Sequence, residues 1–120
     1  ILDELKIDID PATVVKSLPV SKQQMVEIAK ALSTRARILI MDEPTSALTE
    51  REIVELFRIV NDLKRQGCAI VYISHRLEEL KEITDRVSII SSGSVLFEGT
   101  AEEAVHDPDV RRVYLGENYV

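Results

Sequence analysis

The chain is poor in glycine, and this scarcity excludes one kind of nucleotide site. Its 120 residues contain only four glycines, and none of them is followed by lysine. The GxxxxGK[ST] loop that cradles nucleotide phosphates needs a glycine directly before its lysine, because the loop backbone wraps the phosphates and the lysine balances their charge. This sequence therefore cannot form such a loop.

Other features are also missing. The single cysteine, Cys68, excludes an internal disulfide and suits a reducing compartment. No apolar run approaches the ~18–20 residues that span a bilayer. Asp3, Glu4 and Asp8 interrupt the N-terminus, which therefore does not resemble a signal peptide, so we expect a cytoplasmic location. The net charge of -6 gives no electrostatic basis for binding nucleic acid, and no such partner is expected.

Two long amphipathic helices are predicted, each from a capping box followed by an apolar stripe. Ser21 opens an S-x-x-Q pattern before a helix from about 22 to 32. Thr49 and Glu52 form T-x-x-E before the second helix, which we expect to end at Gly67, where glycine can take a left-handed conformation.

Short apolar runs lie between these helices and after them. The runs 38–41 and 68–74 predict strands of a parallel sheet, and the first is expected to be buried. The run 86–90 turns into 94–97 and predicts a hairpin, followed by small helices. This order of elements is typical of a layered α/β fold.

Two adjacent carboxylates, Asp42 and Glu43, follow the first strand. Carboxylates at the carboxyl end of a parallel strand sit where open α/β sheets bind ligands. His75 follows the second strand, so neighbouring strands would bring the three side chains to one edge. Taken alone, the carboxylates could simply begin a solvated turn, and a lone histidine is more often an ordinary surface or core residue.

The stretch 38–49, ILIMDEPTSALT, resembles the Walker B motif and D-loop of ABC-type ATPases. The resemblance implies that Asp42 binds Mg²⁺ through water and that Glu43 is the general base acting on the attacking water. It also implies that Ser46 belongs to a D-loop facing a partner subunit. His75, after IVYIS, resembles the switch histidine that contacts the γ-phosphate of ATP.

The segment 18–32, LPVSKQQMVEIAKAL, resembles the signature region of the same family but departs from it at the contact residues. The letters PVSK stand where the family has SGGQ. Ser21, Lys22 and Gln23 are candidate nucleotide-binding residues, since Lys22 would attract phosphate and Ser21 could donate a hydroxyl unless it caps the helix. A plain capped helix without ATP contact is the alternative, and the sequence leaves both open.

The resemblance covers nearly all of the chain but only the second half of a nucleotide-binding domain. It implies a three-layer P-loop NTPase-like fold with a truncated parallel sheet, a C-terminal hairpin and small helices. Residues 1–36 would end the helical subdomain, 37–91 would form the Walker B, D-loop and switch-histidine core, and 92–120 the hairpin and last helices. The body most resembles ATPase subunits of bacterial sugar importers. The tail is more similar to branched-chain amino-acid and lipopolysaccharide transporter ATPases, which leaves a composite or engineered chain possible.

The implied function is part of an ATPase subunit that uses ATP and Mg²⁺ to energise solute transport, with sugar expected. We expect a homo-oligomer at the inner face of the plasma membrane, attached to permease subunits. A missing N-terminal half or a second ATPase subunit would supply the phosphate-binding loop, so the isolated chain is expected to be inactive. The alternative is a non-catalytic interaction or dimerisation module that keeps the fold.

Overall fold

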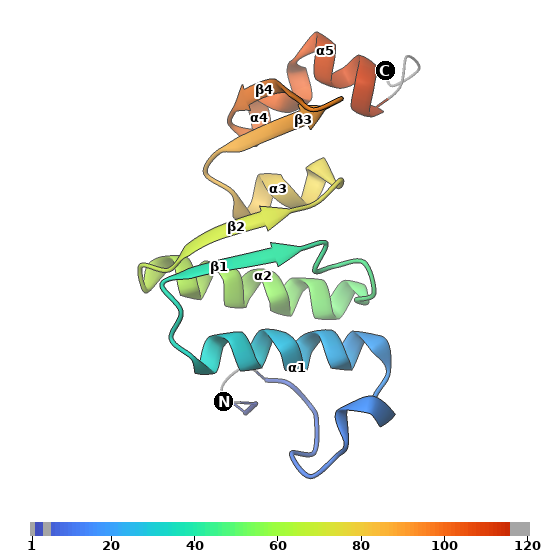
Figure 1. The fold of residues 1–120 in the computed structure, drawn as a ribbon, viewed down its shortest axis with the longest axis vertical. Coiled ribbons are helices and arrows are strands. Elements are labelled where there is room, and N and C mark those ends of the chain that lie inside the picture. The colour runs from blue at the N-terminus through green and yellow to red at the C-terminus, as the bar shows by residue number, and fades with distance from the viewer. Residues whose placement is uncertain (1, 4–5, 116–120) are drawn as a thin grey trace. The chain divides into compact units, whose positions relative to one another are not determined.

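The computed structural model describes residues 2–3 and 6–115 and divides the chain into two compact units, 1–74 and 75–120. The first unit holds two long helices and a parallel pair of strands, and the second holds a hairpin and short helices (Figure 1). None of the described helices is long and apolar enough to cross a bilayer. The three-part division predicted from the sequence separates functional segments rather than compact units, and it stays a prediction.

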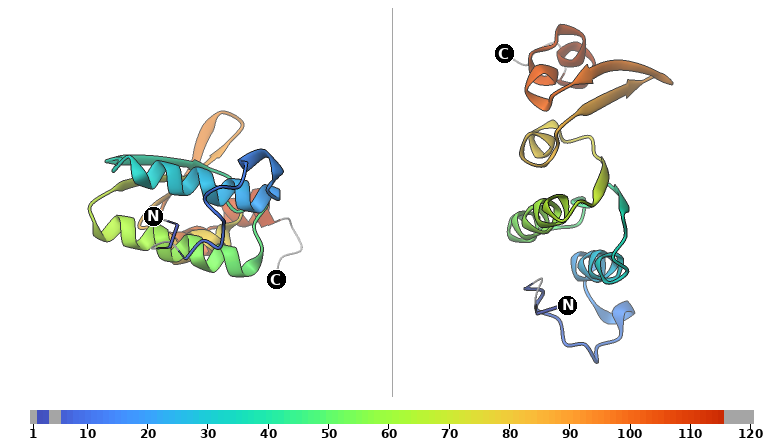
Figure 2. Two further views of the ribbon diagram at one scale, coloured as in Figure 1. Left: turned by 90° about the horizontal axis from the view of Figure 1, so that it is seen from below. Right: turned by 90° about the vertical axis from the view of Figure 1, so that its left-hand side faces the viewer.

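The parallel strands of the first unit form as the sequence predicts. Strand β1 (Ile38–Asp42) pairs with β2 (Ala69–Ile73) in a register that places Asp42 opposite Ile73. Helices α1 (Val20–Ser33) and α2 (Glu50–Arg65) lie on the same face of this pair (Figure 2). Helices and sheet thus make two layers within this unit.

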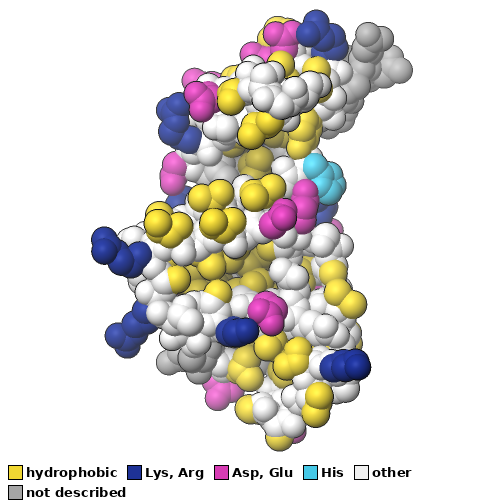
Figure 3. All heavy atoms as spheres, viewed as in Figure 1, with side chains coloured by type: hydrophobic (Ala, Val, Ile, Leu, Met, Phe, Trp, Pro, Cys, Tyr) yellow, Lys and Arg dark blue, Asp and Glu magenta, His cyan; other side chains and the backbone are white. Residues whose placement is uncertain are grey.

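The expectation of a buried first strand is wrong for one face of the sheet. Met41 faces the helices and is buried, whereas Ile38 and Ile40 are each 66% exposed. On β2, Val71 and Ile73 are 50% and 47% exposed, and hydrophobic side chains gather over these strands in Figure 3. The physical reason is that both long helices of the unit cover the opposite face, and no described element of the first unit covers this one.

Helix α2 begins and ends where its sequence signals predict. The Thr49 hydroxyl accepts from the Glu52 amide, and the Glu52 carboxylate accepts from the Thr49 amide at 2.9 Å. At the other end Gly67 has a φ of 85°, and its amide and that of the next residue donate to carbonyls of the last turn. This pair of bonds is a Schellman motif. The buried face of α2 comprises Ile53, Leu56, Phe57, Ile59 and Val60.

Helix α1 differs from its prediction at the start, where the Ser21 capping box does not form. The helix begins at Val20, after a short 3-10 turn (Val15–Ser17), and Pro19 occupies the N-cap position. The Pro19 carbonyl accepts the first helical bond from the Gln23 amide at 3.0 Å, and no described side chain caps the helix. The fixed φ of proline suits the start of a helix. Ser21 therefore lies inside the first turn.

The second unit contains the predicted hairpin and small helices. In chain order its elements are α3 (Leu77–Ile83), β3 (Val87–Ser91), β4 (Ser94–Gly99), α4 (Ala101–His106), α5 (Pro108–Val110) and a π-helical turn (Arg111–Leu115). Ser92 and Gly93 both have positive φ and make the two-residue turn of the antiparallel hairpin. Thr100 and Glu103 form a second capping box at the start of α4.

Candidate functional site

Both predicted carboxylates stand at the carboxyl end of the parallel strand pair. Asp42 is the last residue of β1 and is exposed, and Glu43 follows it and is half-buried. The Glu43 amide donates to the Ile73 carbonyl at 2.8 Å, so a main-chain bond to β2 holds the turn in place. The structure thus puts the Asp-Glu pair at the edge where parallel sheets bind ligands.

The backbone of Glu43 has an unusual conformation that the sequence did not reveal. Its φ is 47°, in the left-handed region that side chains with a Cβ atom rarely adopt. Its carbonyl accepts from the Ser46 amide at 3.3 Å, which closes the turn. Strained non-glycine residues of this kind cluster at functional sites. The chain therefore reverses direction at the second carboxylate.

The loop after Glu43 is anchored at its start and open in its middle. Pro44 and Thr45 are buried, and Thr45 is only 2% exposed. Ser46 is exposed, and so is the alanine after it. Because the start of the loop is buried and its middle is exposed, the Ser46 side chain is accessible from outside the chain.

His75 lies just beyond the second strand along the chain. Strand β2 ends at Ile73, and His75 follows two residues later as the first residue of the second unit, with an exposed side chain. Within the first unit the structure brings Asp42 and Glu43 together with the end of β2. That His75 joins them at one edge stays a prediction.

The three signature-like residues all lie in the first turn of α1, and Lys22 and Gln23 make hydrogen bonds within the chain. The Gln23 side chain donates to the Leu18 carbonyl at 2.8 Å, and the Lys22 ammonium donates at 3.2 Å to a main-chain carbonyl of the preceding segment. The Ser21 hydroxyl is one of the smaller influences that lower the pKa of the Glu52 carboxyl at the start of α2. Their contact with nucleotide stays a prediction.

Glu52 is a residue that the sequence identified only as a helix cap. The Thr49 backbone amide is the largest influence holding the pKa of the Glu52 carboxyl below its ordinary value of 4.5. Partial burial opposes this shift, while the hydroxyls of Thr49 and Ser21 and the ammonium of Lys22 add to it. Glu52 therefore stays ionised to a lower pH than an ordinary glutamate, which preserves its cap on the start of α2.

Comparison with known proteins gives two family matches, one at each end of the chain. The model described as "ABC transporter" matches residues 1–46, and the one described as "Branched-chain amino acid ATP-binding cassette transporter" matches 94–120. Between and across these ends, the chain is 55% identical over 112 residues to the ribose import ATP-binding protein RbsA of Rhodopirellula baltica. This match covers 92% of the chain and 22% of that protein.

Solved structures agree with the sequence matches. An ATP-binding cassette of an ABC transporter in its ADP conformation matches with a TM-score of 0.79 at 28% identity. A nucleotide-free cassette from an ABC transporter matches with a TM-score of 0.83 at 27% identity. Each match covers 97% of this chain and 47% of the cassette.

The chain belongs to the ATP-binding cassettes of ABC transporters. The expected P-loop NTPase-like α/β fold is thereby confirmed. The chain spans about a fifth of the length of the curated relative and just under half of each solved cassette.

The residues of this cassette segment fit a magnesium ion better than they fit the phosphates of ATP. Among the described residues, no group of three or more His, Cys, Asp or Glu could hold a metal ion by itself. Mg²⁺ commonly keeps several waters and uses one or two carboxylates together with substrate phosphates, and the exposed Asp42 suits that role. The phosphates themselves need backbone amides and a lysine of a kind that this sequence does not contain.

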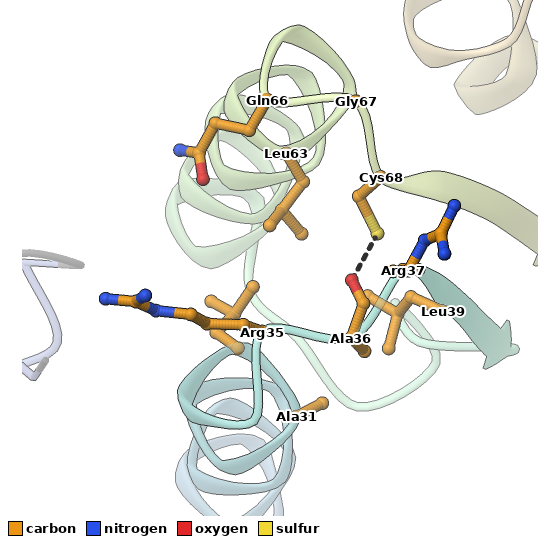
Figure 4. Close-up of a pocket in the computed structure, with 10 residues that line it drawn as sticks. Ala31, Arg35, Ala36, Arg37, Leu39, Leu63, Gln66, Gly67 and Cys68 are labelled. Carbon is orange, nitrogen blue, oxygen red and sulfur yellow. Dashed lines mark hydrogen bonds between the residues drawn. The ribbon is translucent and has the colours of Figure 1, made fainter.

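A hollow of about 460 Å³ lies at the other end of β1 from the two carboxylates. It is bordered by the C-terminal ends of α1 and α2 and the start of β1 (Figure 4). In its wall the Cys68 thiol donates to the Ala36 carbonyl at 3.3 Å. Because parallel sheets bind ligands beyond the carboxyl ends of their strands, this hollow is not the cassette's candidate nucleotide site.

Proposed function

We propose that this chain is part of a catalytic ATPase subunit of an ABC transporter that takes up sugar. The observation that carries the proposal is the Asp42–Glu43 pair at the carboxyl end of β1, within a chain that belongs to the ATP-binding cassettes. The strand, the sharp turn and the open loop after it support this reading together.

Asp42 and Glu43 take different parts in the proposed reaction. Asp42 would hold Mg²⁺ through water, and the ion supplies positive charge to the phosphate oxygens when it is bound. Glu43 would accept the proton of the water that attacks the γ-phosphate, which requires its carboxylate to come within about 2.6–3.2 Å of that water. Phosphoryl transfer depends mainly on positioning and charge stabilisation, so two fixed carboxylates suit it.

The phosphate-binding loop would come from outside this sequence, whereas His75 and Ser46 belong to this chain. A loop of the GxxxxGK[ST] type, on a preceding half of the cassette or on a second subunit, would hold the phosphates, and His75 would contact the γ-phosphate. The exposed Ser46 would face the partner in a head-to-tail dimer. Such an ATPase would be attached to permease subunits at the inner face of the membrane.

The transported solute is proposed from the relatives. The Rhodopirellula baltica relative is named a ribose import protein, which supports a sugar as the solute. The match of residues 94–120 to the branched-chain amino acid model is the observation that favours a different solute class. At 55% identity over most of the chain, the ribose relative carries more weight.

A second candidate function is a non-catalytic interaction module. The letters PVSK in place of SGGQ favour it, and so do the hydrogen bonds that Lys22 and Gln23 make inside the chain. The retained Asp42 and Glu43 argue against it, because an interaction module has no need of two carboxylates at this strand end.

Supplying the absent loop separates the two functions. The chain would be joined to the preceding half of a sugar-importer cassette. Mg²⁺-dependent ATP hydrolysis would then be measured for the joined protein, for its Asp42→Asn variant and for the matched control variant Glu50→Gln. Glu50 is an exposed carboxylate at the first position of α2. Turnover that Asp42→Asn abolishes and Glu50→Gln retains supports the ATPase. A folded, nucleotide-binding protein without turnover would instead support the interaction module.

A further inference from the structure

Glu79 is the only charged residue that is buried in the part of the chain that the structure describes. It lies in the first turn of α3, and only 6% of its surface is exposed. The buried apolar residues Leu77, Leu80 and Ile83 anchor the same short helix in the second unit. A charged group loses its hydration when it is buried, so it is tolerated there only with partners that compensate the charge. The partners of Glu79 therefore show what this residue holds in place.

One of these partners is Arg76, the residue directly after His75. The Arg76 guanidinium forms an ion pair with the Glu79 carboxylate at 2.8 Å. The main chains of the two residues are joined as well, since the Glu79 amide donates to the Arg76 carbonyl at 3.1 Å. Arg76 is thus held through its side chain and through its carbonyl by one buried residue of α3.

The neighbouring carboxylate, Glu78, forms an ion pair of a different kind. Glu78 also lies in the first turn of α3 and pairs with Lys81 at 3.5 Å, which is further along the same helix. Its side chain is 75% exposed, whereas that of Glu79 is 7% exposed. Exposed pairs contribute little, because water screens the charges and both side chains lose freedom. Two adjacent glutamates of one helix turn therefore differ in burial and in whether they reach back to Arg76.

Arg76 ends the three-residue connection between β2 and α3, and His75 is the middle residue of that connection. At the β2 end, the Ile73 carbonyl accepts from the Glu43 amide at 2.8 Å. At the α3 end, Glu79 holds the last residue of the connection. The backbone of His75 is therefore bounded by a fixed residue two positions before it and by another directly after it.

We propose that Glu79 is a positioning residue for His75 and that it acts through Arg76. The contacts between Glu79 and Arg76 lie within the second unit and are a property of this chain. Because they limit the conformations of residue 76, they limit the positions from which the His75 backbone can present the imidazole ring. The consequence for nucleotide, which is a constant placement of His75 against the γ-phosphate, rests on the proposed ATPase function.

The role of Glu79 can be tested in the chain as it stands, without nucleotide. Nitrogen-15 relaxation would give the backbone order parameters of the His75 and Arg76 amides in the parent, in Glu79→Ala and in the matched control Glu78→Ala. The parent amides should have order parameters of about 0.85, as rigid backbone does, and Glu79→Ala should lower them below about 0.6. The control should keep the parent values. Amides that are already mobile in the parent, no change in Glu79→Ala, or an equal loss in both variants overturns the proposal.

A reciprocal variant keeps the test decisive if Glu79→Ala fails to fold. Arg76→Ala truncates a side chain that is 47% exposed and leaves the buried apolar face of α3 intact. It should lower the order parameter of the His75 amide as Glu79→Ala does, because it removes the same ion pair from the other side. Arg76→Lys keeps a positive charge and should restore most of the lost order. A His75 amide that is as rigid in Arg76→Ala as in the parent would contradict the role of the pair.

The nucleotide consequence has a separate readout in the chain joined to the preceding half of a cassette. Glu79→Ala should lower kcat several-fold while the KM for ATP stays within about twofold, and Glu78→Ala should change neither. In a His75→Ala background, Glu79→Ala should have no further effect, because a residue that acts only through His75 has nothing left to position. A parent-like kcat in Glu79→Ala, or losses that add in the double variant, overturns the positioning role. If the joined protein has no turnover at all, the proposed function fails, whereas the relaxation measurements still decide whether Glu79 holds the residue after His75.

Discussion

The left-handed backbone of Glu43 predicts an unusual response to small residues at that position. With a φ of 47°, any side chain that carries a Cβ atom is strained there, and glycine is not. Glu43→Ala and Glu43→Gly both remove the carboxylate, so a comparison of the two isolates the backbone. We expect the glycine variant to be the more stable one.

The expected difference follows from two opposing effects. The left-handed conformation costs a residue with a Cβ atom about 1–2 kcal/mol. Alanine regains about 0.4–1 kcal/mol because its unfolded chain has less freedom to lose than that of glycine. The net advantage of glycine at position 43 is therefore about 1 kcal/mol.

Urea unfolding followed by circular dichroism measures this difference. With a slope of about 2 kcal/mol per molar, the glycine variant should unfold at roughly 0.5 M more urea than the alanine variant. Val54 is a matched control, since it is 68% exposed within α2, where glycine should be less stable than alanine by about 1 kcal/mol. The glycine variant must therefore be the more stable of the pair at position 43 and the less stable of the pair at position 54. If Glu43→Ala unfolds at the same urea concentration as Glu43→Gly, the reasoning is refuted.

Three further predictions concern the isolated chain. Calorimetry should detect no micromolar affinity for Mg·ATP and no hydrolysis, because no loop holds the β- and γ-phosphates; a micromolar dissociation constant would contradict this. The pKa values of Glu52 and Glu103 are lowered in the folded chain, so their contribution to stability is complete above the ordinary value of 4.5 and is lost as the pH falls through the lower folded values. Unfolding followed between pH 6 and 3 should show this loss, and the Glu103→Gln variant should show a smaller one; equal pH profiles would count against it. Sedimentation at high concentration should show association through the exposed sheet, weakened by Ile40→Lys, because a bare apolar strand pair favours pairing with another chain. A parent chain that stays monomeric at high concentration would contradict association through the exposed strands.

Features fixed by neighbouring residues were predictable from the sequence. The box of Thr49 and Glu52 and the C-terminal Gly67 mark both ends of α2, because the bonds that define them join residues within one or two turns. The hairpin turn at Ser92 and Gly93 is local in the same way. In the site, Asp42 and Glu43 were placed correctly at the strand end.

Features that depend on distant parts of the chain were not predictable. Ser21 has the form of a cap, yet Pro19 takes the cap position and Ser21 lies inside the first turn of α1. The burial of Ile40 depends on what covers the sheet, which an apolar run does not specify. The left-handed φ of Glu43 had no signal, since glutamate is not a residue that marks such a turn.

The central claim is that Glu43 activates the attacking water in a complete cassette. Its most direct test measures ATP binding and single-turnover hydrolysis by the complete subunit with Glu43 or with Glu43→Gln. The amide keeps the shape of the side chain but cannot act as a base, so binding should persist while most of the turnover is lost. Turnover within about twofold of the parent would contradict the assignment of Glu43 as the general base.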